Sequence, residues 1–552
     1  MTIRSLTSVL VLATSLSLTA QSRPAISASV PVPTKRTTPP LVVMIVVDQF
    51  RADYVQRYGG LWTKGLRRMI DRGAYFPLAA YPYSGTVTCA GHSTVGTGTF
   101  PRTHGMIANT WYDRDAKKSI ACTQDATATS VGYGGSPGTE HHSAKWLATN
   151  TFADELRNQL PIAPHIASFS LKARSSIGMA GHAGDLVVWF EDAGLWASST
   201  AFTKTPQSGF DAYATKHAVS QQYVRIWDRL LPPAAYLFAD EGLAEQKPDD
   251  GTVLFPHPQT RPSGTPDQGF YANWERTPFV DEALTDMAIT FSEGFGKGRG
   301  TDMLAVSYSA LDYVGHRYGP KSHEVQDVLL RLDVQLGKLF DTLDQRLGAG
   351  QYVVALTADH GVAPIPEQVL AEGLDAGRFT AASITTRLTE AFKAFATDTV
   401  SPIANSTGTD VYFSPAALAI IRSNSAARKA LEDAALAAPG IARIYWSDDL
   451  AMGISGDDPI KRSEILSYMP GRSADLLLVP KQYWIATASG TTHGSPNLYD
   501  QRVPVMLMGI GVRPGQYQTT VTPADVAPTL AYLTGITLPR AEGRALTEAI
   551  VR

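Results

Sequence analysis

Seven side chains with metal-binding or nucleophilic groups lie at or just beyond the ends of segments that have the composition of buried strands. The segments LVVMIVVD, MLAVSYSALD and YVVALTADH end at Asp48, at Asp312 and at the pair Asp359 and His360. Runs of Val, Ile, Leu and Ala without polar alternation are typical of strands covered on both faces, as in α/β proteins. Open α/β sheets bind their ligands at such strand ends. The complete set is Asp48, Thr88, Asp312, His316, Asp359, His360 and His493.

Three Asp, three His and one hydroxyl are enough ligands for two adjacent divalent metals, the arrangement that phosphoryl-transfer chemistry uses. Asp312 and His316 are spaced i, i+4 in LDYVGHRYG, so they share one face of a helical turn, and both are suitable zinc ligands. An ordinary surface Asp–His pair is the alternative for that motif taken alone. Asp359 and His360 are adjacent and can splay from a strand end toward a shared metal. His493 lies in the glycine-flanked loop GTTHGSP.

Thr88 lies in TVTCAGHSTVGTG, which leads into a segment that can form a helix. A hydroxyl at a helix N-terminus faces unpaired backbone N–H groups and a positive dipole end, which suits a phosphoryl group. A free Thr hydroxyl is a poor nucleophile, and coordination to a metal would activate it. Taken alone, Thr88 would be interpreted as an N-cap. The surrounding set of metal ligands favours the nucleophile.

Two cations and an amide could bind the phosphoryl oxygens. Lys172 and Arg174 are two apart in IASFSLKARSSIGM, so in a strand they would project from one face. Two cations on an apolar strand are costly unless an anion neutralises them, and the alternative is a solvated pair on an edge strand. The amide of Asn109, in IANTWYD, could donate to another phosphoryl oxygen, although Asn is also a common turn residue.

The composition is that of an ordinary globular protein. The 552 residues are 44% hydrophobic and 18% charged, with a net charge of −3, so no basic excess indicates a nucleic-acid partner. Strand-like segments fall into three blocks. The stretches 198–278 and 365–481 between them differ in composition and in hydrophobic periodicity. We interpret these two stretches as insertions, the second of them a compact cap, into a single α/β core that begins at residue 41 and runs to residue 552.

The N-terminus has the layout of a secretory signal peptide. Arg4 precedes the apolar run LTSVLVLATSLSL, and small residues follow around Ala20. We expect a signal peptide over residues 1–20, a linker over 21–40, and an exported, periplasmic protein without a stable membrane anchor. The two cysteines, Cys89 and Cys122, could form one disulfide in that compartment or remain buried free thiols.

Together the motifs resemble the alkaline phosphatase superfamily, and more narrowly the PafA-type alkaline phosphatases of bacterial periplasms. The motifs that carry the resemblance are VVDQFRADY, TVTCAGHSTVGTG, HGMIANTWYD, SLKARS, DYVGHRYGP, TADHGVAP, TTHGSPNLYDQRVPVMLMG and VTPADVAPTLAYLTGI. The resemblance implies an α/β fold with an alkaline-phosphatase-like core, in which a mostly parallel central sheet is flanked by helices and carries the two large insertions.

The resemblance also assigns roles to residues. It implies that Thr88 is the nucleophile, and that two zinc ions per chain are bound. One zinc would be held by Asp48, Asp359 and His360, the other by Asp312, His316 and His493, and phosphate would be bound by Asn109, Lys172 and Arg174. Related diesterases have an aromatic residue after the nucleophile and Asn before the following His, where this chain has Cys89 and Gly91.

The expected function is therefore that of an alkaline phosphatase that hydrolyses small phosphomonoesters through a phosphothreonine, with two zinc ions and as a monomer. A phosphodiesterase or nucleotide pyrophosphatase would share the metals, but the Lys172 and Arg174 pair disfavours it. A sulfatase is excluded, because Cys89 is followed by Ala-Gly-His and not by the sequence that matures to formylglycine. A secreted binding protein on an inactive hydrolase scaffold would have lost at least one of the seven ligands, and none is lost.

Overall fold

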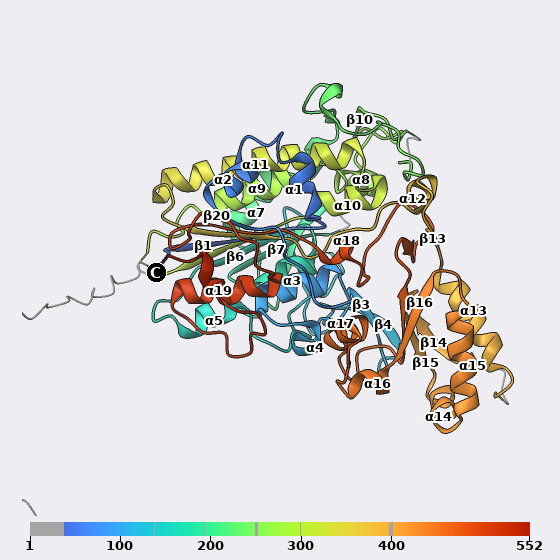
Figure 1. Ribbon diagram of the computed structural model, residues 1–552. Coiled ribbons are helices and arrows are strands. Elements are labelled where there is room, and N and C mark those ends of the chain that lie inside the picture. The colour runs from blue at the N-terminus through green and yellow to red at the C-terminus, as the bar shows by residue number, and fades with distance from the viewer. Residues whose placement is uncertain are drawn as a thin grey trace, which may run out of the picture. The chain divides into compact units, whose positions relative to one another are not determined.

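A ten-stranded sheet forms the centre of the structure, a computed structural model that describes residues 38–136, 138–191, 194–248, 252–298, 300–396 and 401–551 (Figure 1). The order of its strands is β20-β2-β19-β12-β1-β11-β6-β7-β8-β5. Their bounds are β1 (Leu41–Val47), β2 (Ala74–Phe76), β5 (Ser130–Tyr133), β6 (Ile166–Ser170), β7 (Leu186–Glu191), β8 (Leu195–Ser199), β11 (Asp302–Tyr308), β12 (Val353–Thr357), β19 (Val505–Gly509) and β20 (Gly515–Gln516).

The central strands β12, β1, β11, β6 and β7 all run parallel. Strands β19 and β8, which flank them, are antiparallel to their inner neighbours. The mostly parallel α/β fold is therefore confirmed. Because parallel strands end at the same edge of a sheet, the residues after β1, β11 and β12 must lie near one another.

Helices cover both faces of the sheet, which is why β1 is apolar at every position. Val43 and Ile45 belong to one apolar core, and Val42 and Met44 belong to the other. The first core contains α1 (Asp53–Tyr58), α2 (Gly65–Arg72), α9 (Phe279–Phe291), α10 (Ala310–Tyr318) and α11 (His323–Leu347). The second contains residues of α3 (Thr88–Thr97), α5 (Phe152–Gln159), α6 (Ala173–Ala180) and α19 (Val526–Thr534). Figure 1 shows α2 and α11 on one side of the sheet, and α5 and α19 on the other.

Two strand predictions were too long. Strand β11 ends at Tyr308, so Asp312 lies in the first turn of α10 and not at the strand end. Strand β6 ends at Ser170, so the prediction that Lys172 and Arg174 share one face of a strand was wrong. Lys172 is the N-cap residue of α6, and its carbonyl accepts hydrogen bonds from the N–H groups of the helix's first turn. In both cases the short strand-to-helix connection of a parallel sheet brings the polar residues into the first helical turn.

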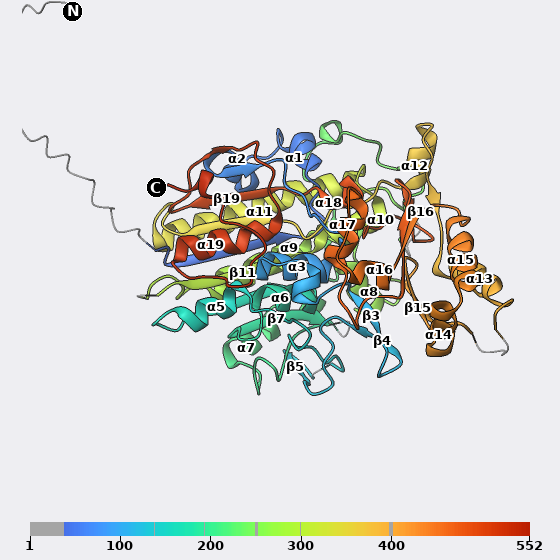
Figure 2. The ribbon, with the colours of Figure 1, turned by 60° about the horizontal axis from the view of Figure 1, so that its bottom comes forward.

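A smaller antiparallel sheet with its own helices forms a lobe, which we define as residues 379–396 and 401–486. Its strand order is β14-β15-β17-β16. Helices α13, α14 and α15 pack on one face of this sheet, and α16 and α17 pack on the other, with α17 nearer the central sheet (Figure 2). The bounds are β14 (Ile403–Ser406), β15 (Asp410–Phe413), β16 (Ile441–Trp446), β17 (Leu476–Pro480), α13 (Ala381–Phe392), α14 (Pro415–Ser423), α15 (Ser425–Leu436), α16 (Ser447–Ala451) and α17 (Pro459–Ser467).

The segment 198–278 has less regular structure where it is described. It contains α7 (Ser208–Lys216), β9 (Ile226–Trp227), β10 (His257–Pro258) and α8 (Gln268–Trp274). The division of the chain into a core with insertions at 198–278 and 365–481 stays a prediction. The predicted signal peptide, and the predicted linker as far as residue 37, lie outside the described residues.

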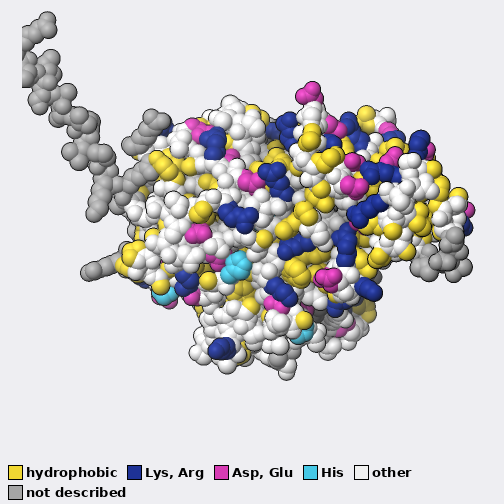
Figure 3. Space-filling model, turned by 90° about the horizontal axis from the view of Figure 1, so that it is seen from below, with side chains coloured by type: hydrophobic (Ala, Val, Ile, Leu, Met, Phe, Trp, Pro, Cys, Tyr) yellow, Lys and Arg dark blue, Asp and Glu magenta, His cyan; other side chains and the backbone are white. Residues whose placement is uncertain are grey.

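Cys89 and Cys122 form a disulfide, so they are not free thiols. It joins the first turn of α3 to the residue after β4 (Lys118–Ala121), which pairs with β3 (Thr110–Asp113) in a hairpin. Within the described part of the chain, no helix is long and apolar enough to span a membrane. On the face seen in Figure 3, Lys and Arg side chains are interspersed with acidic and hydrophobic ones.

Candidate active site

Asp48, Asp359 and His360 form a first group of candidate metal ligands at the carboxyl edge of the sheet. Asp48 follows β1, and the other two follow the neighbouring parallel strand β12. All three side chains are fully buried, and one ligand atom from each lies within 4.8 Å of the others. The Nε2 atom of His360 is 3.5 Å from Asp48 Oδ1 and 3.2 Å from Asp359 Oδ2.

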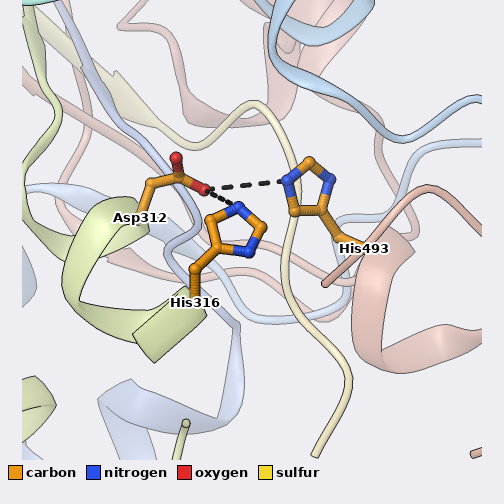
Figure 4. A group of neighbouring side chains, drawn as sticks. All are labelled: Asp312, His316 and His493. Atoms are coloured by element: carbon orange, nitrogen blue, oxygen red, sulfur yellow. Dashed lines mark ion pairs between the residues drawn. The ribbon is translucent and has the colours of Figure 1, made fainter. Parts of the chain in front are cut away.

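Asp312, His316 and His493 form a second group of the same kind (Figure 4). The first two project from α10 with the predicted i, i+4 spacing, and His493 comes from the loop before α18 (Leu498–Gln501). Asp312 Oδ1 is 3.2 Å from His316 Nε2 and 3.7 Å from His493 Nε2. Two groups of three ligands therefore arise from four separate parts of the chain.

The two groups lie side by side, and Thr88 lies beside the first. The rings of His360 and His493 stack with their centroids 3.5 Å apart. The Thr88 hydroxyl is 3.5 Å from His360 Nε2 and is almost completely buried. Thr88 is the first residue of α3, whose N-cap is Val87, so Thr88 is not the cap of its helix. The fold thus brings all seven predicted residues together.

Each candidate histidine ligand has its ring held in one orientation by a backbone carbonyl. The Nδ1 atoms of His360, His316 and His493 donate to the carbonyls of Gly361, Thr491 and Thr86 at 2.9, 2.7 and 2.8 Å. With the proton on Nδ1, the lone pair of Nε2 points at the carboxylates, as in protein metal sites. Burial lowers the pKa of His360 and of His493, which favours the neutral form that binds metals.

The carboxylates concentrate negative charge that the described side chains do not balance. Burial raises the pKa of Asp48 well above its ordinary value, and the charges of Asp312 and Asp359 raise it further. The ammonium of Lys172 contacts two of the three carboxyl groups, those of Asp48 and Asp312. Asp48 Oδ1 and Asp359 Oδ2 are buried and accept no hydrogen bond. Such oxygens, facing imidazole lone pairs, fit divalent cations with mixed nitrogen and oxygen ligands.

Lys172 joins the two groups. Its ammonium donates to Asp48 Oδ2 at 2.6 Å and also to Asp312 Oδ2. Burial works to lower the pKa of Lys172, but Asp312 and Asp48 outweigh it and hold the pKa above its usual value. In turn, although burial opposes this, Lys172 and His316 hold the pKa of Asp312 well below its ordinary value.

Asn109 and Arg174 line one cavity together with Lys172. The carbonyl oxygen of the Asn109 side chain accepts a hydrogen bond of 2.8 Å from the backbone N–H of Cys89, next to Thr88. This bond orients the amide and leaves its NH₂ group to donate. The Nε of Arg174 is buried and has no hydrogen-bond partner. The three residues predicted to bind phosphate therefore lie around one space near Thr88.

Two further residues support the ligands and were not identified from the sequence. Gln49 links the two groups: its backbone N–H donates to Asp359 Oδ1 at 3.0 Å, and its amide donates to Asp312 Oδ1 at 2.7 Å. Its backbone has a positive φ of 67°, which is unusual for a residue other than Gly. His92 donates from Nδ1 to the Thr88 carbonyl at 2.9 Å, and Nδ1 is also 3.2 Å from Asp359 Oδ2. The only signal in the sequence was that both lie inside quoted motifs.

Comparison with known proteins identifies the family. The model of the type I phosphodiesterase / nucleotide pyrophosphatase family matches residues 42–499. Alkaline phosphatase PafA of Elizabethkingia meningoseptica is 32% identical over 525 residues, which are 93% of this chain and 95% of that protein. The crystal structure of PafA matches with a TM-score of 0.85 at 30% identity, over 94% of this chain and 100% of that chain. The chain belongs to the PafA-type alkaline phosphatases.

Other relatives agree with this assignment. Alkaline phosphatase PhoV of Synechococcus elongatus is 30% identical over 524 residues, which are 93% of each chain. Murine ectonucleotide pyrophosphatase / phosphodiesterase 5 matches with a TM-score of 0.54 at 13% identity, over 92% of this chain and 100% of that chain, and this likeness shows a shared fold. The family model places this chain within the wider phosphodiesterase and pyrophosphatase family.

Gly91 provides a test of the first ligand group. A Cβ atom at Gly91 would overlap the carbonyl oxygen and the Cβ of Asp359, because α3 packs directly on this candidate metal ligand. We expect Gly91→Ala to displace Asp359 and to lower the affinity for a divalent metal about 10- to 100-fold, measured with zinc as the probe in metal-buffered solution. Gly209→Ala in α7 is the matched control, because its Cβ would meet no atom within 4 Å. Unchanged zinc affinity in the Gly91 variant would contradict the contact.

Proposed function

We propose that this PafA-type alkaline phosphatase hydrolyses phosphate monoesters with Thr88 as the nucleophile and with two zinc ions as cofactors. The observation that carries the proposal is the position of the Thr88 hydroxyl, 3.5 Å from His360 Nε2 and beside two adjacent ligand groups. A crystal structure of a PafA variant with one threonine, one asparagine, one lysine and one arginine substituted matches this chain with a TM-score of 0.85. These are the residue types of Thr88, Asn109, Lys172 and Arg174, which supports their assignment as a unit.

The proposed reaction proceeds by two in-line displacements. When bound, zinc at Asp48, Asp359 and His360 would lower the pKa of the Thr88 hydroxyl, and zinc at Asp312, His316 and His493 would stabilise negative charge on the leaving oxygen. Thr88 Oγ1 attacks phosphorus, the ester oxygen leaves from the opposite side, and Thr88 carries the phosphoryl group. Water then attacks the phosphothreonine from the side the alcohol has left, which restores Thr88 and releases phosphate.

The cations beside Thr88 favour monoesters over diesters. The ammonium of Lys172, the guanidinium of Arg174 and the NH₂ group of Asn109 would meet the charge on the phosphoryl oxygens. A diester carries a second substituent on one of these oxygens, so it would lose a charge-assisted contact there. Phosphodiester or pyrophosphate hydrolysis is the second candidate function, because the family model that matches residues 42–499 is named for those activities.

The remaining parts of the proposal concern the state of the protein. We propose that it acts in the periplasm, on the basis of the signal-peptide pattern over residues 1–20. We further propose that it acts there as a monomer on small phosphomonoesters. A non-catalytic binding protein is disfavoured, because all seven candidate ligands and nucleophile groups are retained and lie together.

Metal removal tests the cofactor. We expect exhaustive chelation to abolish hydrolysis of p-nitrophenyl phosphate, and added zinc to restore it, since Lys172 offsets only part of the charge of the three buried carboxylates. Elemental analysis should find two equivalents of zinc per chain. Magnesium and calcium serve as controls and should not restore activity. Full activity in a preparation shown to contain no transition metal would refute the two-metal assignment.

Thr88→Ala tests the covalent route. The variant should lose at least about 10³-fold in kcat, because the hydroxyl is the attacking group, while it keeps its fold and its zinc content. Acid quenching of the wild-type protein during turnover of ³²P-labelled substrate should label Thr88, and Thr88→Ser should still be labelled. A Thr88→Ala rate within tenfold of wild type would exclude phosphothreonine as an intermediate.

Arg174→Ala and Lys172→Ala test the preference for monoesters. We expect kcat/KM for p-nitrophenyl phosphate to fall about 10²- to 10⁴-fold, and kcat/KM for bis-p-nitrophenyl phosphate to fall less than about tenfold. Arg174→Ala is the cleaner change, because Lys172 also neutralises Asp48 and Asp312. Lys118→Ala, on the exposed strand β4, is the charge-matched control. Equal losses on both substrates would remove the basis for monoester selectivity.

A further inference from the structure

A second cavity, of about 250 Å³, opens beside the second ligand group, between the loops of the central sheet and the lobe. Val87, Asn109 and His493 line it on the side of the central sheet. Asp410 and Trp484 line it on the side of the lobe. His493 belongs to the ligand group that faces the leaving oxygen in the proposed reaction. The cavity therefore lies where the alcohol part of the substrate must extend.

The cavity has an acidic lining. Three of its lining residues, Asp410, Glu464 and Asp500, carry carboxyl groups, and none of its lining residues is Lys or Arg. Glu464 is only 6% exposed and Asp500 only 1%. The Oδ1 atom of Asp500 is buried and has no hydrogen-bond partner. Arg51, which does not line the cavity, partly offsets the charge of Asp500, so Glu464 and Asp410 are the carboxyl groups that a positively charged ligand would neutralise.

Burial raises the pKa values of all three carboxyl groups. Burial, with a smaller contribution from the nearby Asp410, raises the pKa of Glu464 to about 8, although Ser84 opposes the shift. Burial alone raises the pKa of Asp410 to about 6. Burial also raises the pKa of Asp500 to about 7, against hydrogen bonds from Ser495 and the positive charge of Arg51. A cation placed among these groups would favour their charged forms.

Helix α17, which carries Glu464, is hydrogen-bonded to the segment that leads to Thr88. The Oγ atom of Ser467, on the same helix α17 as Glu464, accepts the backbone N–H groups of Ser84 and Gly85, both at 3.0 Å. Thr86, two residues before Thr88, also contacts the loop that carries His493. Its carbonyl accepts a hydrogen bond of 2.8 Å from His493 Nδ1. These hydrogen bonds therefore fix the position of Glu464 relative to Thr88 and to the second ligand group.

Asn109 lines both cavities. The cavity of Lys172 and Arg174 holds two cations together with Glu140 and Glu275, whereas the other cavity has carboxyl groups and no Lys or Arg. The cavity of Lys172 and Arg174 suits the phosphoryl oxygens, whereas the cavity of Asp410 and Glu464 would repel a second anion. The aliphatic and aromatic side chains of Leu477, Ile485 and Trp484 provide walls for a short alkyl chain. The chemistry that fits both ends at once is a phosphate joined by an alkyl chain to a positive charge.

We propose that this cavity binds the alcohol part of the substrate, and that Glu464 and Asp410 select phosphomonoesters whose alcohol carries an ammonium group. The inference rests on the proposed phosphomonoesterase function and defines the substrate class of the same site. Asp500 adds negative charge to the cavity, and it also orients the 495–500 turn through hydrogen bonds to the backbone and hydroxyl of Ser495. Glu464 and Asp410 are therefore the better residues to substitute.

The test compares aminoalkyl phosphates with alkyl phosphates of the same length. Phosphoethanolamine is paired with n-propyl phosphate, in which a methyl group replaces the ammonium, and the pairs with three- and four-carbon amino alcohols allow for the depth of the cavity. The quantity measured is the ratio of kcat/KM within each pair, which does not depend on the fraction of folded protein. The proteins are the wild type, Glu464→Gln, Asp410→Asn and the double variant. Asp457→Asn, an exposed carboxylate in the same lobe, is the matched control.

We expect the wild type to prefer the ammonium substrate by about tenfold or more in at least one pair, and the double variant to lose that preference. Asp457→Asn should keep it. A ratio near one in every pair, or a preference that survives in the double variant, would overturn the inference. The inference would also be overturned if the two substitutions lowered kcat/KM for glycerol 1-phosphate as much as for the ammonium substrates. That result would assign the carboxyl groups to the recognition of hydroxyl groups. If the wild type hydrolyses neither these esters nor p-nitrophenyl phosphate, the proposed function itself fails, and the inference with it.

Discussion

The burial of three carboxylates at one edge of the central sheet is the constraint on which the rest of the site depends. Asp48, Asp312 and Asp359 are almost completely removed from water, and an isolated buried carboxylate costs several kcal/mol. Lys172 bridges two of them, and Gln49 donates hydrogen bonds to two. Asp48 Oδ1 and Asp359 Oδ2 still accept no hydrogen bond, so these two oxygens could bind divalent cations. Metal ions would therefore neutralise negative charge that the protein buries at this edge of the central sheet. Metal binding should for that reason stabilise the folded protein.

Thr88, the proposed nucleophile, is held by the same packing that holds the candidate metal ligands. Helix α3 is buried at all ten positions, and it packs so closely on Asp359 that Gly91 has no room for a side chain. Its first turn is fixed by the disulfide of Cys89, by the Asn109 side chain and by His92. Thr88 therefore has a defined position before any substrate binds. Two cavities adjoin it, one with the cations Lys172 and Arg174 beside Glu140 and Glu275, the other with Glu464 and Asp410 and no Lys or Arg. In the proposed function this arrangement would orient a substrate as well as bind it.

Much of the fold and of the candidate site could be predicted from the sequence, and the errors have identifiable causes. Asp48, Asp359 and His360 were found because a strand buried on both faces is continuously apolar, so the first polar residue after it marks the sheet edge. The same pattern overextended the strand before Asp312 and misplaced Lys172 and Arg174, since an apolar run does not reveal where a strand turns into a helix. Gln49 was missed because nothing in its neighbours indicates that its side-chain amide and its backbone N–H donate to residues 263 and 310 positions away.

The sequence by itself determined the class of fold, the family and the chemical types at the site, because each of these is recorded in local runs of residues and in short motifs. Only the tertiary structure decided which ligands share a group, how the imidazole rings are turned, and that Cys89 bonds to Cys122. It alone placed Glu464 and Asp410, from a lobe with no motif of its own, beside the site. The physical reason is that these contacts join segments far apart in the chain, and their energies depend on burial and on distance, which local sequence does not specify.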